Sequence, residues 1–127
     1  NTNDVRESPA ITICKDLLEE GCYLNIFDPK VTELQIKEEL AVNDNFGSLE
    51  TNCGSWNFTS SINQAVDGAD AIVILTDWSE FHNLNFEILK KTMRAPSWIF
   101  DTRNVVNFKT AKSYGFKVWK LGDGSIN

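Results

Sequence analysis

The run Ala71–Leu75, which reads AIVIL, constrains the fold more than any other stretch of this chain. It holds five consecutive apolar residues, and the polar pair Thr76-Asp77 follows it. Continuous apolar runs of this length are typical of parallel strands that are covered on both faces. Parallel strands are joined by crossover connections, which are usually helices. The run therefore predicts a chain in which helices and strands alternate.

Helical patterns and short apolar runs do alternate along the sequence. The first helix has Ser8 as its N-cap and Pro9 in its first turn, and Gly21 marks its end. We expect helices at 8–20, 33–40, 60–66, 78–82, 86–91 and 107–114, strands at 22–27, 56–59, 71–75, 97–100 and 116–121, and a loop at 42–55. This order predicts an α/β fold, a Rossmann-like three-layer α/β/α arrangement with a mostly parallel sheet.

The predicted order opens with a helix, whereas a doubly wound sheet normally opens with a strand. We therefore expect a first strand upstream of Asn1, so that residues 1–127 are a single domain cut from a larger protein. In the usual strand order that first strand is central. Its loss predicts a gap in the sheet, which leaves the fragment marginally stable or is filled by another segment or chain.

Composition and charge exclude several classes of protein. The formal net charge of -6 argues against nucleic-acid partners, which bind through excess Lys and Arg. No apolar run is long enough to span a membrane, and the residues at the start show no signal-peptide pattern, so we expect neither feature. Cys14, Cys22 and Cys53 form no CxxC pair, so we expect neither a disulfide framework nor a zinc site. Reduced thiols predict a cytoplasmic protein.

Ligands of open α/β sheets bind beyond the carboxyl ends of the strands. Asp28, Asp77 and Arg103 follow predicted strands, and Arg6 precedes the first helix on the same edge. An arginine there can grip phosphate bidentately beside helix N–H groups. Plainer interpretations remain open: Asp28 as a turn residue, Asp77 as a helix cap, Arg6 as a surface charge. Arg103, directly after a buried strand, is the strongest ligand candidate.

No catalytic or metal-binding set emerges from the sequence. His82 has no Ser or Cys partner at a recognisable spacing, so we expect it to lie on the surface. Cys53 lies in a predicted loop with no activating base nearby. We assign no catalytic and no metal-binding residue to this chain.

Four segments, in this order, resemble one family: NTNDVRESPA at 1–10, IFDPKV at 26–31, DGADAIVILTDWSEF at 67–81 and WIFDTRNV at 98–105. They are similar to the C-terminal, UDP-binding domain of the UDP-glucose/GDP-mannose dehydrogenase family. Each segment is a weak signal alone, and together they are spread over residues 1–105 of the chain. The set looks closest to the branch that oxidises UDP-glucose.

The resemblance implies a two-domain, homo-oligomeric enzyme that oxidises the C6 alcohol of UDP-glucose to the carboxylate of UDP-glucuronate. Its N-terminal domain would carry NAD and the catalytic cysteine, so the present chain alone would not turn over. Carried over by motif, Arg103 matches the arginine that contacts the nucleotide-sugar. Arg6 matches the arginine that reaches the NAD bound in the other domain.

The sequence departs from the family at three places. Thr102 stands where Gly is common, Asp77 replaces the usual Glu, and the family's Phe-Lys pair would lie upstream of Asn1. Two related activities stay open, the oxidation of a UDP-N-acetylhexosamine and that of GDP-mannose. An alternative of another class is a receiver-like signalling domain with Asp28, Asp77 and Asp101 as a phospho-acceptor pocket. A purely structural or oligomerising domain is a third reading.

Overall fold

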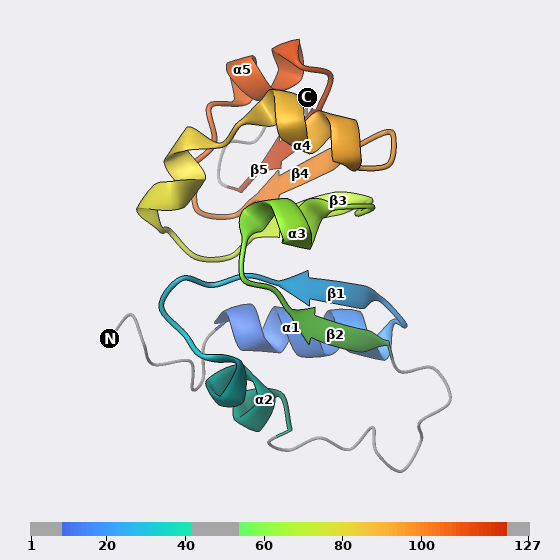
Figure 1. The fold of residues 1–127 in the computed structure, drawn as a ribbon, viewed down its shortest axis with the longest axis vertical. Coiled ribbons are helices and arrows are strands. Elements are labelled where there is room, and N and C mark those ends of the chain that lie inside the picture. The colour runs from blue at the N-terminus through green and yellow to red at the C-terminus, as the bar shows by residue number, and fades with distance from the viewer. Residues whose placement is uncertain (1–8, 42–53, 122–127) are drawn as a thin grey trace. The chain divides into compact units, whose positions relative to one another are not determined.

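A computed structural model describes residues 9–41 and 54–121, drawn in colour in Figure 1. The chain divides into two compact units, residues 1–60 and 61–127, and each is described by itself. Unit 1 holds α1 (Pro9–Glu19), β1 (Tyr23–Ile26), α2 (Glu33–Ala41) and β2 (Ser55–Phe58). Unit 2 holds α3 (Ile62–Val66), β3 (Ala71–Ile74), the 3₁₀ helix η2 (Ser79–Asn83), α4 (Phe86–Thr92), β4 (Trp98–Asp101), α5 (Phe108–Ser113) and β5 (Lys117–Lys120).

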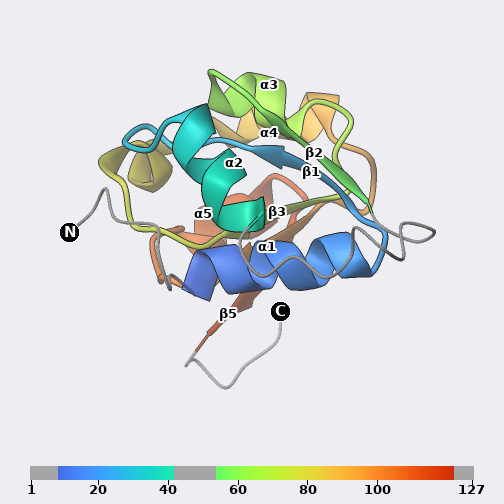
Figure 2. The same cartoon turned by 90° about the horizontal axis from the view of Figure 1, so that it is seen from below.

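Unit 1 is a two-stranded parallel sheet with helices packed on it. β1 and β2 run in register from Tyr23 opposite Ser55 to Ile26 opposite Phe58. Both helices and the chain between them contribute to one buried cluster, which consists of Leu18, Val31, Ile36 and Leu40. Figure 2 shows α1 running along this unit. Burial of this apolar cluster is the main force that holds unit 1 together.

Two glycines shape the passage from α1 into β1. Gly21 adopts a φ of 90°, a left-handed conformation that glycine reaches without steric cost, so the predicted helix end is confirmed. The predicted N-cap at the other end, Ser8, lies outside the described residues. Gly54 approaches the Cys22 backbone so closely that a Cβ would lie 1.7 Å from the carbonyl oxygen of Cys22. Any larger residue at position 54 would push the start of β2 away from Cys22, which directly precedes β1.

Unit 2 is a three-stranded parallel sheet in the order β3-β4-β5. The row Ile72, Ile99 and Val118 crosses it and joins the main core cluster, to which all three helices of the unit contribute. Side chains alternate between faces along a strand, so the next row on this face is Ile74, Asp101 and Lys120. That second row ends the sheet at its carboxyl edge.

The structure confirms the predicted α/β class, with parallel pairing throughout both sheets. Several strand boundaries differ from the expected ones by one residue: β2 begins at Ser55 instead of Trp56, and the strand expected to begin at Ser97 begins at Trp98. Ser97 is fully buried and has a φ of 48°, and its hydroxyl donates to the carbonyl of Arg94 at 3.1 Å. It therefore belongs to the turn before β4. The predicted single domain over 1–127 stays a prediction.

The edge of β3 away from β4 pairs with no strand in the described part of the chain. Val73 in this strand is 41% exposed, which is unusual for a parallel strand with the sequence AIVI. Within the ranges 9–41 and 54–121, no helix is long and apolar enough to cross a membrane.

Candidate functional site

The carboxyl edge of the unit 2 sheet brings a charged row to the end of a buried core. Asp101 is the last residue of β4, and Lys120 is its register partner at the end of β5. Asp101 is fully buried, although its type is among those that proteins bury least. A buried carboxylate must be compensated by hydrogen bonds or by charge.

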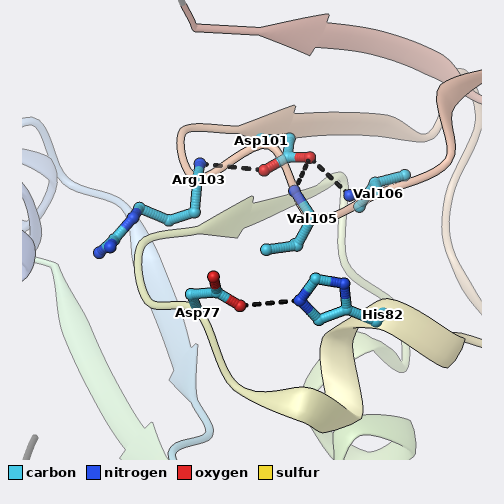
Figure 3. Close-up of polar contacts among 6 residues, drawn as sticks. All are labelled: Asp77, His82, Asp101, Arg103, Val105 and Val106. Atoms are coloured by element: carbon cyan, nitrogen blue, oxygen red, sulfur yellow. Dashed lines mark hydrogen bonds and ion pairs between the residues drawn. The ribbon is translucent and has the colours of Figure 1, made fainter.

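Three backbone N–H groups of the following loop compensate Asp101, as Figure 3 shows. Its Oδ1 accepts from the N–H of Arg103 at 3.0 Å. Its Oδ2 accepts from the N–H groups of Val105 at 2.9 Å and Val106 at 2.8 Å. The side chain that ends β4 therefore dictates the course of residues 102–106, which we call the arginine loop.

Arg103 is exposed at the tip of this loop, and its side chain runs away from the Asp101 carboxylate (Figure 3). Its Nη1 lies 3.5 Å from the carbonyl oxygen of Leu75, at the end of β3. Within the described ranges, the guanidinium makes this one long hydrogen bond and no ion pair. Most of its donors remain available to an anionic ligand.

Thr102 fixes the start of the arginine loop to the neighbouring strand. Its hydroxyl donates to the carbonyl of Ile74 at 2.7 Å, and its N–H donates to the same oxygen at 3.2 Å. The Thr102 hydroxyl thus adds a tie between β3 and β4. The positive φ in this loop falls instead on Asn104, at 62°, and Asn tolerates that conformation well.

Asp77 does not cap the helix that follows it, so that interpretation was wrong. The residue before η2 is Trp78, which makes no side-chain capping bond. Asp77 instead lies 2.8 Å from Nε2 of His82, and both side chains are about half exposed. His82 lies on the surface, as predicted. Among the described residues, the Asp77 carboxylate contacts His82 and forms no ion pair with Arg103.

The aspartates expected of a receiver-like pocket have structural roles. Oδ1 of Asp28 accepts from the N–H groups of Lys30 at 2.7 Å and Val31 at 3.1 Å, which confirms the turn interpretation. Asp101 is buried beneath the arginine loop. In the ranges 9–41 and 54–121, no three His, Cys, Asp or Glu side chains are grouped so as to hold a metal ion. The described residues therefore do not support a phospho-acceptor site.

Two candidates, Arg6 and Cys53, lie outside the described residues. Conversely, Lys120 was not selected as a site residue from the sequence. It interrupts an apolar strand, and its ammonium donates to the carbonyl of Val106 at 3.0 Å. A basic residue in the last position of a buried strand is the signal that could have identified it.

Comparison with known proteins gives a consistent result. Residues 1–108 match the family described as "UDP-glucose/GDP-mannose dehydrogenase family, UDP binding domain". The chain is 38% identical to UDP-glucose 6-dehydrogenase 2 of Arabidopsis thaliana over 130 residues, 96% of this chain and 27% of that protein. It is also 38% identical to UDP-glucose 6-dehydrogenase of Drosophila melanogaster over 122 residues, 96% of this chain and 26% of the relative. The chain thus spans about a quarter of the length of these relatives.

Proposed function

This chain belongs to the UDP-glucose/GDP-mannose dehydrogenase family, and we propose that it is the nucleotide-sugar-binding part of an NAD-dependent UDP-glucose 6-dehydrogenase. One observation supports the ligand-binding role that this proposal gives to Arg103. A buried carboxylate holds the loop of this exposed arginine at the carboxyl edge of a parallel sheet, where ligands of such sheets bind. Guanidinium suits the pyrophosphate of a nucleotide-sugar because it donates bidentately.

In this proposal, the chemical steps of the reaction take place on a part of the enzyme outside this chain. NAD, bound mainly by an N-terminal domain, accepts the hydrides when the C6 alcohol becomes a carboxylate. Arg6 reaches that cofactor from this chain, an assignment that depends on the motif at 1–10. The present chain carries no catalytic residue, so it binds without turnover. The full enzyme is homo-oligomeric and works in the cytoplasm, in keeping with the free thiols of Cys14 and Cys22.

Calorimetric titration of UDP into the full chain and its Arg103→Gln variant tests the proposal. Loss of a charge-assisted hydrogen-bond pair should weaken binding roughly tenfold or more. Arg94→Gln is the matched control, since Arg94 is also exposed but contacts Asp70, at 3.4 Å, before β3 begins. GDP and UDP-N-acetylglucosamine, titrated in parallel, distinguish the related activities. Equal UDP affinities for Arg103→Gln and the unchanged chain would remove Arg103 from the site.

A further inference from the structure

The peptide groups on both sides of Val106 are held by two oppositely charged side chains. Its N–H donates to Oδ2 of Asp101 at 2.8 Å, and its carbonyl accepts from Nζ of Lys120 at 3.0 Å. Asp101 and Lys120 are register partners on adjacent strands, so one sheet row supplies both contacts. The N–H carries a partial positive charge and faces the Asp101 carboxylate, whereas the carbonyl oxygen carries a partial negative charge and faces the Lys120 ammonium.

The position of Lys120 is itself fixed. Its ammonium lies 5.2 Å from the ring centroid of Phe108, in the first turn of α5, where a cation is attracted to the ring face. The Lys120 side chain is half-buried, and the packing of its methylene groups restricts the rotamers that it can adopt. Lys120 thus ties the end of the arginine loop to both β5 and α5.

We propose that Asp101 and Lys120 are positioning residues that set where Arg103 meets its ligand. The proposal rests on the nucleotide-sugar-binding role of Arg103 given above. Asp101 holds the loop at Arg103, Val105 and Val106, and Lys120 holds its far end. Both side chains contact backbone groups of the arginine loop, so each would act through the backbone that carries Arg103. Removing the ammonium of Lys120 takes away the contact to the carbonyl of Val106 and leaves this end of the loop held through the N–H of Val106.

The test is a double-mutant cycle in the full chain, with UDP titrated and followed by NMR, which measures weak binding. Lys120→Met keeps the apolar stem and removes the donor, and it should weaken UDP binding about fivefold. In the Arg103→Gln background the same change should have no further effect. Lys120→Arg, which keeps the charge and the donor, should restore most of the affinity.

Lys117→Met is the matched control. Lys117 begins the same strand, so it lies at the opposite end of β5 from Lys120. Its ammonium is also near an aromatic ring, 5.9 Å from the ring centroid of Trp98. Its replacement should leave UDP affinity unchanged. Circular dichroism checks that each variant is folded at the titration temperature. Lys120→Gln, which removes the charge and shortens the reach, replaces Lys120→Met if that variant unfolds.

The possible results distinguish a failure of the positioning role of Lys120 from a failure of the UDP-binding role of Arg103. Equal losses from Lys120→Met in the unchanged chain and in the Arg103→Gln background would show that Lys120 acts independently of the arginine, and would overturn the positioning role. Unchanged affinity in Lys120→Met would overturn it as well. An Arg103→Gln chain that binds UDP normally would instead overturn the proposed function of the site.

Discussion

The Cys14 thiol shows how strongly a single residue is shaped by its surroundings. It lies on α1 and packs against the buried cluster of unit 1. Burial disfavours the thiolate and raises the pKa of Cys14 to about 11. At pH 8 the folded chain should therefore hold several hundredfold less Cys14 thiolate than an unfolded chain whose thiol has a pKa of about 8.5.

Iodoacetamide labelling followed by mass spectrometry measures this difference, because the thiolate is the nucleophile. Cys14 should react slowly in the folded chain and rapidly in guanidinium chloride. Since the folded-state pKa is the higher one, the unfolded chain loses its proton first as the pH rises. Stability should thus decrease between about pH 8.5 and pH 11. Equal labelling rates in the folded and denatured chains would contradict the burial of Cys14.

Arg103 was predictable from the sequence, whereas its supports were not. A charged residue directly after an apolar run stands out, and the edge at which parallel strands bind ligands is known in advance. Asp101 was considered as part of a phospho-acceptor pocket, because the sequence does not reveal that three backbone N–H groups turn back to it. The pairing of Asp77 with His82 depends on a 3₁₀ turn, which periodicity does not distinguish from an α-helix.

Short helices at the sheet edge depend on their caps more than on their length. α5 has six residues, and Oδ1 of Asn107 accepts from the N–H of Thr110 at 3.2 Å at its start. Isolated helices this short are unstable in water. Asn107→Ala should therefore lower the free energy of unfolding by about 1 kcal/mol, measured by urea denaturation.

Asn83→Ala supplies the comparison, because Asn83 is an exposed asparagine in η2 whose side chain makes no hydrogen bond with the rest of the described chain. Its replacement should change the free energy of unfolding by less than about 0.5 kcal/mol. If both variants were equally stable, the capping role of Asn107 would be wrong.

The elements themselves were predictable because their signals are local. Continuous apolar runs indicated β3 and β4, and Pro9 and Gly21 bounded α1. The start of β4 was missed because Ser97 is held in its turn by Arg94 and by the ammonium of Lys90, 3.2 Å from its hydroxyl. Such side-chain contacts depend on tertiary packing, which strand propensity does not take into account.

At the scale of the whole molecule, the main feature is the edge of β3 that pairs with no strand among residues 9–41 and 54–121. Nothing in its four residues discourages another strand from pairing, since Ala71–Ile74 contains no charge and no proline. We therefore expect a parallel strand to complete the edge of β3.

Extending the chain before Asn1 by roughly ten residues, a strand and its turn, should raise the melting temperature. The matching segment of the Drosophila relative is a suitable source, and differential scanning calorimetry gives the measurement. The same extension with two central prolines is the control, because proline removes the N–H groups that pair strands. A melting temperature equal to that of the unextended chain would contradict the expectation.

The Asp101 contacts also bear on how this domain can change over evolutionary time. The carboxylate accepts from main-chain N–H groups only, so these three contacts do not depend on the side chain at position 103. A different residue there would be presented from the same place on an unchanged scaffold. The preference of this edge for one kind of ligand can therefore drift by single substitutions at position 103, while selection on the fold itself falls on Asp101.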